Sequence, residues 1–494
     1  MTAGVATFQR GLTAHRAGLA TEAIAAYRAA VAADPTLAAA HFNLGQLLRD
    51  QLDFGGAAAA FERAATLKPS ASDAWLNQGI CREHLGELER ALDCYREAAR
   101  LEPDSAVAQF NSGNVMRTLG DLAGAQAAFG RATERAPEAA EVWLNLGNVE
   151  RELGRLDEAI GSLKRAESLR PDWPELRWNL ALAYLASGQL EQGWDAYDAR
   201  WLRAGLSMQR GFPWPAWTGE SPAGKRVLVW REQGLGDEIL FATCIPDLVA
   251  LGADVCLALD PRLVGLYQRA LPEVRVVEDG CWGDGLFDYH VPLGNLPGLL
   301  RRSRAEFRAR WSYLVPAREQ AALWADRLTT VDSGLRVGIC WRSGLRTADR
   351  RRYYAELQEW LPILSVPGVT FINLQYDECE AELVAAETAS GIRIHRWPQA
   401  DLRNDLEGVA GLLWHLDLVI TAPTAVSSLA GAVGTETWQL DPGTDWTVFG
   451  EDRSPWLPAT RLFRRGGAET NWSAAVGAVV AELTRRVADS APTS

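Results

Sequence analysis

The sequence predicts an α-helical repeat superhelix followed by two Rossmann-like α/β lobes. Three observations lead to this fold class. A 34-residue repeat occupies roughly the first two hundred residues. From residue 225 onward, short apolar runs alternate with amphipathic stretches, which is typical of parallel sheets covered by helices. The alternation begins again near residue 335, so we expect two such lobes in series.

The repeat is defined by small residues and prolines in fixed columns. These columns contain Gly11, Gly45, Gly79, Gly113 and Gly147; Ala23, Ala57, Ala91, Ala125 and Ala159; and Pro35, Pro69, Pro103, Pro137 and Pro171. Their period and composition are those of the tetratricopeptide repeat, in which two helices cross at small residues and a proline ends the second. A sixth repeat, about 174–207, ends in GWDAYDARW, which suits a capping helix. We therefore expect a superhelix over residues 1–207.

An asparagine also recurs every 34 residues, two positions before the glycine column. The members are Asn43, Asn77, Asn111, Asn145 and Asn179. Asparagine is a poor helix former, so its recurrence within helices needs a reason. One interpretation is that each amide bonds a neighbouring turn and locks one repeat to the next. The other is that the amides line a concave groove and bind the backbone of an extended acceptor peptide.

The second half divides into a linker and two lobes. Residues 208–224 contain prolines and glycines without a helical period, and we expect them to pack through Trp214 and Trp217. The first lobe is expected over 225–325, with strands at 227–230, 255–260 and 274–278. The second is expected over 326–494, with strands at 335–341, 369–375, 416–422 and 435–440. Ligands of such sheets bind at the carboxyl ends of the strands.

Composition and charge exclude several classes of protein. The formal net charge is −13 and no basic stripe stands out, which disfavours nucleic acid as a partner. The sequence MTAGVATFQRGL lacks the features of a secretory signal, and we expect no membrane span. Seven cysteines without a C-x-x-C pair disfavour a disulfide framework or a zinc site. A cytoplasmic location is the simplest expectation.

The loop in VLVWREQGLGDEIL is a modified glycine turn between a strand and a helix. Gly234 and Gly236 suit a sharp turn, but Ile239 occupies the third glycine position of a dinucleotide fingerprint. Asp237 is expected at the helix N-terminus, whose dipole stabilises a carboxylate there. It either caps the helix or faces the cleft and accepts the proton of an attacking hydroxyl. In the second case, Gly234 and Gly236 would lie beside the acceptor.

The second lobe contains the better candidates for binding a phosphate. In TAPTAVSSLAG, we expect Thr424, Ser427 and Ser428 at the start of a helix that follows a strand. Backbone N–H groups at such a helix end bind a diphosphate, and hydroxyl groups assist. The alternative is that these hydroxyls only cap the helix.

Arginines cluster after the first strand of the second lobe, in WRSGLRTADRRR. Arg342, Ser343 and Arg346 are the candidates for binding a pyrophosphate or an acidic sugar. Gln375, at the end of FINLQ, either contacts a base or ribose or is a buried amide. Trp341 either stacks on the ligand or packs in the core.

A histidine provides an alternative general base. His290 is expected at a strand end of the first lobe, and histidine titrates nearer neutrality than aspartate. A structural histidine is the competing interpretation. The sequence has no D-x-D pair that would hold a metal-bound sugar diphosphate. We therefore expect no metal site and a transfer in which arginines and a helix dipole neutralise the leaving diphosphate.

These motifs resemble a known family. VLVWREQGLGDEILFATCIPDL is similar to the start of the family 9, heptosyltransferase-like glycosyltransferases, and VGICWRSG, FINLQYDE and DLVITAPTAVSSLAGAVG follow in the order of its donor half. The asparagines resemble the ladder of the O-linked N-acetylglucosamine transferases. The whole chain is similar to bacterial tetratricopeptide glycosyltransferases of the GT-B fold. Asp237 then matches the family's proposed catalytic aspartate, whereas Pro423 and Ser428 replace its usual aspartate and histidine.

The resemblance implies a metal-independent glycosyltransferase with no cofactor other than its nucleotide-sugar substrate. The superhelix would bind a protein acceptor, such as flagellin or another surface protein, and the second lobe would bind the donor. Two alternatives stay open. The acceptor is a free or lipid-linked glycan, or the chain is an inactive protein-binding scaffold.

Overall fold

The computed structural model describes residues 2–202, 210–283, 285–307, 312–331, 333–344, 353–465 and 471–490. The chain divides into two compact units. We call Met1–Asp172 the repeat array and Trp173–Ser494 the α/β unit.

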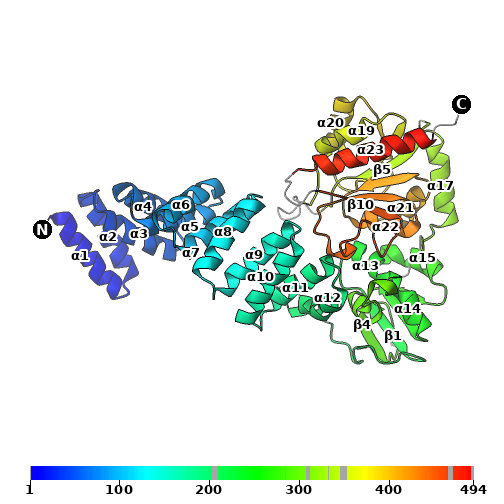
Figure 1. Ribbon diagram of the computed structural model, residues 1–494, viewed down its shortest axis with the longest axis horizontal. Coiled ribbons are helices and arrows are strands. Elements are labelled where there is room, and N and C mark those ends of the chain that lie inside the picture. The colour runs from blue at the N-terminus through cyan, green and yellow to red at the C-terminus, as the bar shows by residue number, and fades with distance from the viewer. Residues whose placement is uncertain are drawn as a thin grey trace. The chain divides into compact units, whose positions relative to one another are not determined.

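The repeat array is a row of antiparallel helix pairs (Figure 1). Its helices are α1 (Ala3–Arg16), α2 (Ala20–Ala33), α3 (Ala38–Asp50), α4 (Phe54–Leu67), α5 (Ser72–His84), α6 (Leu88–Leu101), α7 (Ala106–Thr118), α8 (Leu122–Arg135), α9 (Ala140–Glu152) and α10 (Leu156–Leu169). The predicted repeat is therefore present as five pairs within this unit. Each second helix ends two residues before the proline of its repeat.

The glycine column is explained by contacts inside each pair. A Cβ atom at Gly79 would lie 2.6 Å from the Tyr95 ring, and one at Gly113 would lie 2.7 Å from the Phe129 ring. Both rings are wholly buried. The first helix of each pair therefore has glycine where a large side chain of the second helix packs against its backbone; this side chain is aromatic in four pairs and is Leu163 in the fifth.

The α/β unit begins with the sixth repeat. This repeat consists of α11 (Pro174–Ala186), α12 (Leu190–Tyr197) and the short helix η1 (Asp198–Leu202). The expected boundary at residue 207 differs from the observed division between residues 172 and 173. The sixth repeat therefore packs as part of the α/β unit.

The first sheet has the parallel order β3-β2-β1-β4. Its strands are β1 (Arg226–Trp230), β2 (Asp254–Leu259), β3 (Arg275–Glu278) and β4 (Tyr289–Pro292), and its helices include α13 (Leu235–Phe241), α14 (Ile245–Ala250), α15 (Pro261–Ala270) and α16 (Leu296–Leu300). Val227 and Val229 face the helices. The opposite face is covered by the linker, in which Trp214 packs edge-on against Phe287 at 4.9 Å. Trp217 is also buried, as expected.

The second sheet has the parallel order β10-β9-β8-β5-β6-β7. Its strands are β5 (Leu335–Cys340), β6 (Val369–Asn373), β7 (Ile394–His395), β8 (Leu418–Thr421), β9 (Thr437–Asp441) and β10 (Thr460–Arg464). One face packs on α19 (Leu361–Leu364), α20 (Glu380–Ser390) and α23 (Ser473–Ser490). The other packs on α17 (Arg318–Leu328), α21 (Leu406–Leu413) and α22 (Ala425–Val433). The chain order reverses between β5 and β8, where sheets of this type bind ligands.

The boundary between the lobes also differs from the expected one. Residues 325 and 326 lie inside α17, and α17 packs against α21 of the second lobe. The second lobe therefore begins before Arg318. Within the described ranges, no helix has the length and apolar character needed to cross a membrane.

We predict that Gly79→Ala lowers the free energy of unfolding of the repeat array by about 1–3 kcal/mol, because the added methyl group would overlap the Tyr95 ring. Urea denaturation followed by far-UV circular dichroism measures this change. Gly161→Ala in α10 is the matched control, because its Cβ would meet nothing within 4 Å. The control should gain roughly 0.5–1 kcal/mol from helix propensity alone. Equal stability of the two variants would contradict the packing explanation.

Candidate functional site

The glycine loop of the first lobe meets the helix start of the second. Gly234 is the N-cap of α13, and the Asp237 carboxylate accepts a hydrogen bond from its backbone N–H at 3.3 Å. A Cβ atom at Gly236 would lie 3.2 Å from Ser428 Oγ and 3.6 Å from Ala425 Cα. Two segments that were singled out separately in the sequence are therefore in direct contact. Asp237 also has the capping role that was its alternative interpretation.

The start of α22 presents backbone amides rather than serine hydroxyls. Thr424 is the N-cap, is half-buried, and makes no side-chain capping bond. Ser427 is buried and donates its hydroxyl proton to Gln439 Oε1 at 2.6 Å. Ser428 is 9% exposed and faces Gly236. Of the three predicted residues, Thr424 is the least buried, and its hydroxyl lies 3.5 Å from Thr421 Oγ1 and 3.8 Å from Cys340 Sγ.

Arg342 is already paired within its own lobe. Its guanidinium contacts the Asp377 carboxylate and donates to Glu382 Oε1 at 2.6 Å. The sequence predicts a cation open to a pyrophosphate at this position, whereas these two carboxylates neutralise it. Ser343 follows it and is half-buried. Arg346 lies outside the described residues.

Gln375 and Trp341 have structural roles here. The Gln375 amide donates to the Arg342 carbonyl at 3.0 Å and accepts from the Arg342 N–H at 3.2 Å. It is 2% exposed, which agrees with the buried-amide alternative. Trp341 is wholly buried and donates to Glu382 at 2.8 Å, so its ring has no face open for stacking on a ligand. Both side chains shape the loop that follows β5.

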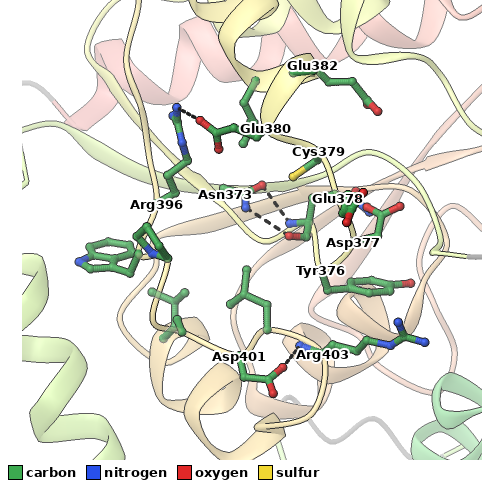
Figure 2. Close-up of a pocket in the computed structure, with 18 of the residues that line it drawn as sticks. Asn373, Tyr376, Asp377, Glu378, Cys379, Glu380, Glu382, Arg396, Asp401 and Arg403 are labelled. Atoms are coloured by element: carbon green, nitrogen blue, oxygen red, sulfur yellow. Dashed lines mark hydrogen bonds and ion pairs between the residues drawn. The ribbon is translucent and has the colours of Figure 1, made fainter.

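A pocket of about 680 Å³ opens at the carboxyl ends of β6 and β7 (Figure 2). Of the residues that line it, Gln375 alone is among the site residues that the sequence predicts. Its lining includes Trp324, Asn373, Gln375, Tyr376, Asp377, Glu378, Cys379, Glu380, Glu382, Arg396, Trp397, Asp401 and Arg403. The signal in the sequence was the polar run YDECEAE directly after FINLQ. Its volume lies within the range of small-molecule sites.

The pocket lining is more acidic than basic. Arg396 is paired with Glu380 at 2.7 Å and Glu387 at 2.8 Å, so its charge is balanced locally. Figure 2 shows Asp377 and Glu378 on the opposite side of the pocket from Arg396. Carboxylates accept hydrogen bonds from hydroxyl and amino groups but repel phosphate. The pocket therefore suits an uncharged polar group such as a nucleoside better than a phosphate.

A buried carboxylate joins the glycine loop to the first sheet. Glu238 is 1% exposed, accepts from Arg231 Nε at 2.6 Å and accepts from the Asp260 backbone N–H at 2.9 Å. Burial raises its pKa to about 7, although Arg231 opposes the shift. Glu238 thus ties α13 to the ends of β1 and β2. Arg262 continues this network by donating to the Arg403 carbonyl of the second lobe at 3.0 Å.

His290 is separated from the glycine loop by the sheet. It pairs in register with Leu228, whose side chain faces the linker, whereas α13 packs on the other face. Its Nδ1 accepts from Trp230 Nε1 at 3.2 Å, and its ring packs on Phe212 at 4.5 Å. Burial lowers its pKa, which favours the neutral ring. The expectation of an alternative base beside Asp237 is therefore not met, because strand register turns this ring away.

The asparagine column lies on the first helix of each pair. Asn77 and Asn145 donate to the carbonyl four residues earlier, at 2.8 and 3.0 Å, and Asn43 lies 3.4 Å from the Tyr27 hydroxyl. Arg49 of the preceding repeat donates to the Asn77 carbonyl oxygen. Asn111 is half-buried, and Asn179, in the α/β unit, is 9% exposed. The amides thus combine local bonds with partial exposure, and the groove stays a prediction.

The family comparison agrees with the helix pairs. The tetratricopeptide repeat model matches residues 5–38, 42–106 and 110–174. The N-terminal region is a tetratricopeptide repeat array. The chain is also 36% identical over 304 residues to protein FlbA of Caulobacter vibrioides. That match covers 57% of this chain and 50% of FlbA, so the chain spans about half the length of this relative.

Several solved structures are similar to part of the chain. The crystal structure of the MamA protein has 21% identity and a TM-score of 0.33, and the match covers 34% of this chain and 92% of that one. YrrB is described as a tetratricopeptide repeat protein with an unusual peptide-binding site. It has 21% identity and a TM-score of 0.33, and the match covers 35% of this chain and 89% of that one. A tetratricopeptide repeat protein from Parabacteroides merdae has 20% identity and a TM-score of 0.35, and the match covers 40% of this chain and 79% of that one.

Glu238 predicts a particular dependence of stability on pH. Its pKa rises from 4.5 to about 7 on folding, so the folded protein holds this proton more tightly than the unfolded chain does. The contribution of Glu238 to stability is therefore fully present below about pH 4.5 and is lost as pH rises to about 7. Glu238→Gln has no such proton, so its melting temperature should rise relative to wild type across that window.

Differential scanning fluorimetry between pH 4.5 and 8 measures this difference. The matched control is Glu278→Gln, at the exposed end of β3. We expect its offset from wild type to stay constant with pH. A constant offset for Glu238→Gln as well would contradict the raised pKa.

Proposed function

We propose that the chain is a glycosyltransferase that moves a sugar from a nucleotide-sugar donor to a hydroxyl of a protein bound by the repeat array. The observation that carries the proposal is the contact of Gly236 with Ala425 and Ser428. It brings the start of α13, which contains Asp237, against the start of α22 in the other lobe, and a nucleoside-sized pocket opens in the second lobe. The family resemblance of the motifs supports the same activity.

The donor would occupy two parts of the second lobe. Its nucleoside would lie in the pocket at the ends of β6 and β7, where carboxylates can accept hydrogen bonds from ribose hydroxyls. Its diphosphate would lie at the start of α22, where backbone amides and Thr424 stabilise negative charge. This division keeps the phosphates away from the acidic lining. The sugar would then lie near α13.

Asp237 would act as the general base. The acceptor hydroxyl oxygen bonds to the anomeric carbon, the bond from that carbon to the diphosphate breaks, and the hydroxyl proton passes to the carboxylate. The nucleoside diphosphate leaves with the electron pair of the broken bond. A carboxylate that caps a helix is a weak base in water, and exclusion of water by the bound donor would raise its basicity. No metal is needed in this scheme, because α22 stabilises the leaving group.

The acceptor would be an extended segment of a protein. Tetratricopeptide arrays bind peptides, and half-buried asparagines recur along the first helices of this one. By resemblance, flagellin or another surface protein modified before export is the class of acceptor that we propose.

A donor screen tests the proposal without a known acceptor. We expect one class among UDP-, GDP-, ADP-, dTDP- and CMP-sugars to raise the melting temperature, because a ligand that binds only the folded state stabilises it. Differential scanning fluorimetry with each sugar nucleotide measures the shift. A chain that no member stabilises would instead be a protein-binding scaffold. The pairing of Arg342 with two carboxylates is the observation that favours this second function.

The role of Asp237 can be separated from donor binding. Asp237→Ala should lower turnover by at least about 100-fold, which is typical for loss of a general base, and leave the donor Kd within a few-fold. Asp237→Asn should do the same while retaining an oxygen that can cap α13. Calorimetry gives the Kd, and release of nucleoside diphosphate gives the turnover. Retained activity in Asp237→Asn would assign the residue to capping alone.

A further inference from the structure

A buried ion pair joins the sixth repeat to the candidate catalytic loop. Arg200, in η1, donates to Glu232 through Nη2 at 2.8 Å and Nε at 3.2 Å. Arg200 is 6% exposed and Glu232 is 5% exposed. The guanidinium also lies over two aromatic rings, 4.4 Å from the centre of Tyr197 and 4.3 Å from that of Trp201. This planar, two-point arrangement is available to arginine but not to lysine.

Further contacts hold the same loop. The Gln233 amide donates to the Tyr197 hydroxyl at 2.7 Å. Asn295 accepts from Arg200 and donates to Asp198 at 3.1 Å. A Cβ atom at position 294 would collide with the Glu232 carboxylate, so the glycine there leaves room for it. Two consecutive loop residues are therefore held by the end of the sixth repeat.

The loop so held carries Asp237. Glu232 and Gln233 directly precede Gly234, the N-cap of α13, and Glu238 fixes the other side of Asp237 through Arg231 and Asp260. The position of the Asp237 carboxylate thus depends on an anchor before it and an anchor after it. The first anchor belongs to the sixth repeat and the second to the sheet.

Helix α12 of the sixth repeat also contacts the second lobe. The Trp194 ring in α12 packs edge-on against Trp446, Phe449 and Trp456, at 6.1, 6.2 and 6.4 Å. Tyr197 packs against Trp446 at 5.4 Å. The three partners lie in the segment that follows β9. One helical turn of the sixth repeat therefore touches both lobes beside the place where α13 meets α22.

We propose that Arg200 is a positioning residue for Asp237, so that the last repeat is a working part of the transfer site rather than only a cap. We call the bonds of Arg200 and Tyr197 to Glu232 and Gln233 the clamp. Its catalytic consequence rests on the proposed function, but the clamp itself does not. Arg200 fixes the backbone of residues 231–234 through Glu232, and the contact of Tyr197 with Gln233 supports it. Movement of α12 would be transmitted to the Asp237 carboxylate through these bonds.

Hydrogen exchange of the full chain, measured by mass spectrometry without ligand, tests the clamp. In Arg200→Lys, which keeps the charge but loses the two-point pairing, we expect amides of residues 233–241 to exchange at least tenfold faster than in wild type. The double variant Arg200→Met/Glu232→Gln removes both charges together. It should show the same local increase even if the single variant is too unstable to purify.

Arg301→Lys is the matched control. Arg301 is equally buried in the first lobe, pairs with Asp247 at 2.8 Å and stacks on Phe307, but it contacts no residue of the 231–237 loop. We expect its effect to be confined to the helices around it. Exchange at residues 233–241 that is unchanged in Arg200→Lys, or raised equally in Arg301→Lys, would overturn the proposal.

Kinetics separate the clamp from the proposed function. With the sugar nucleotide of the five-class panel that gives the largest thermal shift, Arg200→Lys should lower kcat at least tenfold and leave KM for the donor within twofold. A larger effect on KM than on kcat would overturn the positioning role. If wild type turns over no member of the panel while the exchange result holds, the clamp stands and the glycosyltransferase assignment fails.

Discussion

The close approach of α13 and α22 at Gly236 is the constraint on which the rest of the site depends. A Cβ atom at this position would lie 3.2 Å from Ser428 Oγ, so the serine side chain would have to shift by a few tenths of an ångström, and it would lie in van der Waals contact with Ala425 Cα at 3.6 Å. This approach brings the first turn of α13, which contains Asp237, against the start of α22. Everything proposed for the donor and for the base follows from that geometry. It also gives the second glycine of the loop a role other than approach to a phosphate, since Gly236 serves a contact between the lobes.

The charges around the site are arranged in neutralising groups. Arg342 is held by Asp377 and Glu382, Arg396 by Glu380 and Glu387, and Arg200 by Glu232. Arg342, which the sequence presents as a phosphate ligand, thus shapes the loop after β5. In the proposed reaction, stabilisation of the leaving diphosphate would fall mainly to the start of α22. Such a helix end offers fixed dipoles that need no rearrangement during the reaction.

The sequence predicted the repeats and both parallel sheets because each has a local signal. A 34-residue period and apolar runs of strand length can be recognised without any knowledge of tertiary contacts. The site was harder to predict, because its chemistry depends on partners distant in the chain. Arg342 is neutralised by Asp377 and Glu382, which follow a different strand, and His290 is turned away by strand register. The position of the sixth repeat in the α/β unit depends on aromatic contacts that no periodicity reveals.

The most direct test of the account is a hydrogen-exchange footprint of the bound sugar nucleotide that the panel selects. The account predicts slower exchange at residues 424–428, at the start of α22, and in the pocket segments 373–382 and 396–403. It predicts little change at residues 231–234, which the proposed function assigns to the acceptor side. A footprint concentrated on the glycine loop, with none at the start of α22, would contradict the assignment of the donor to the second lobe.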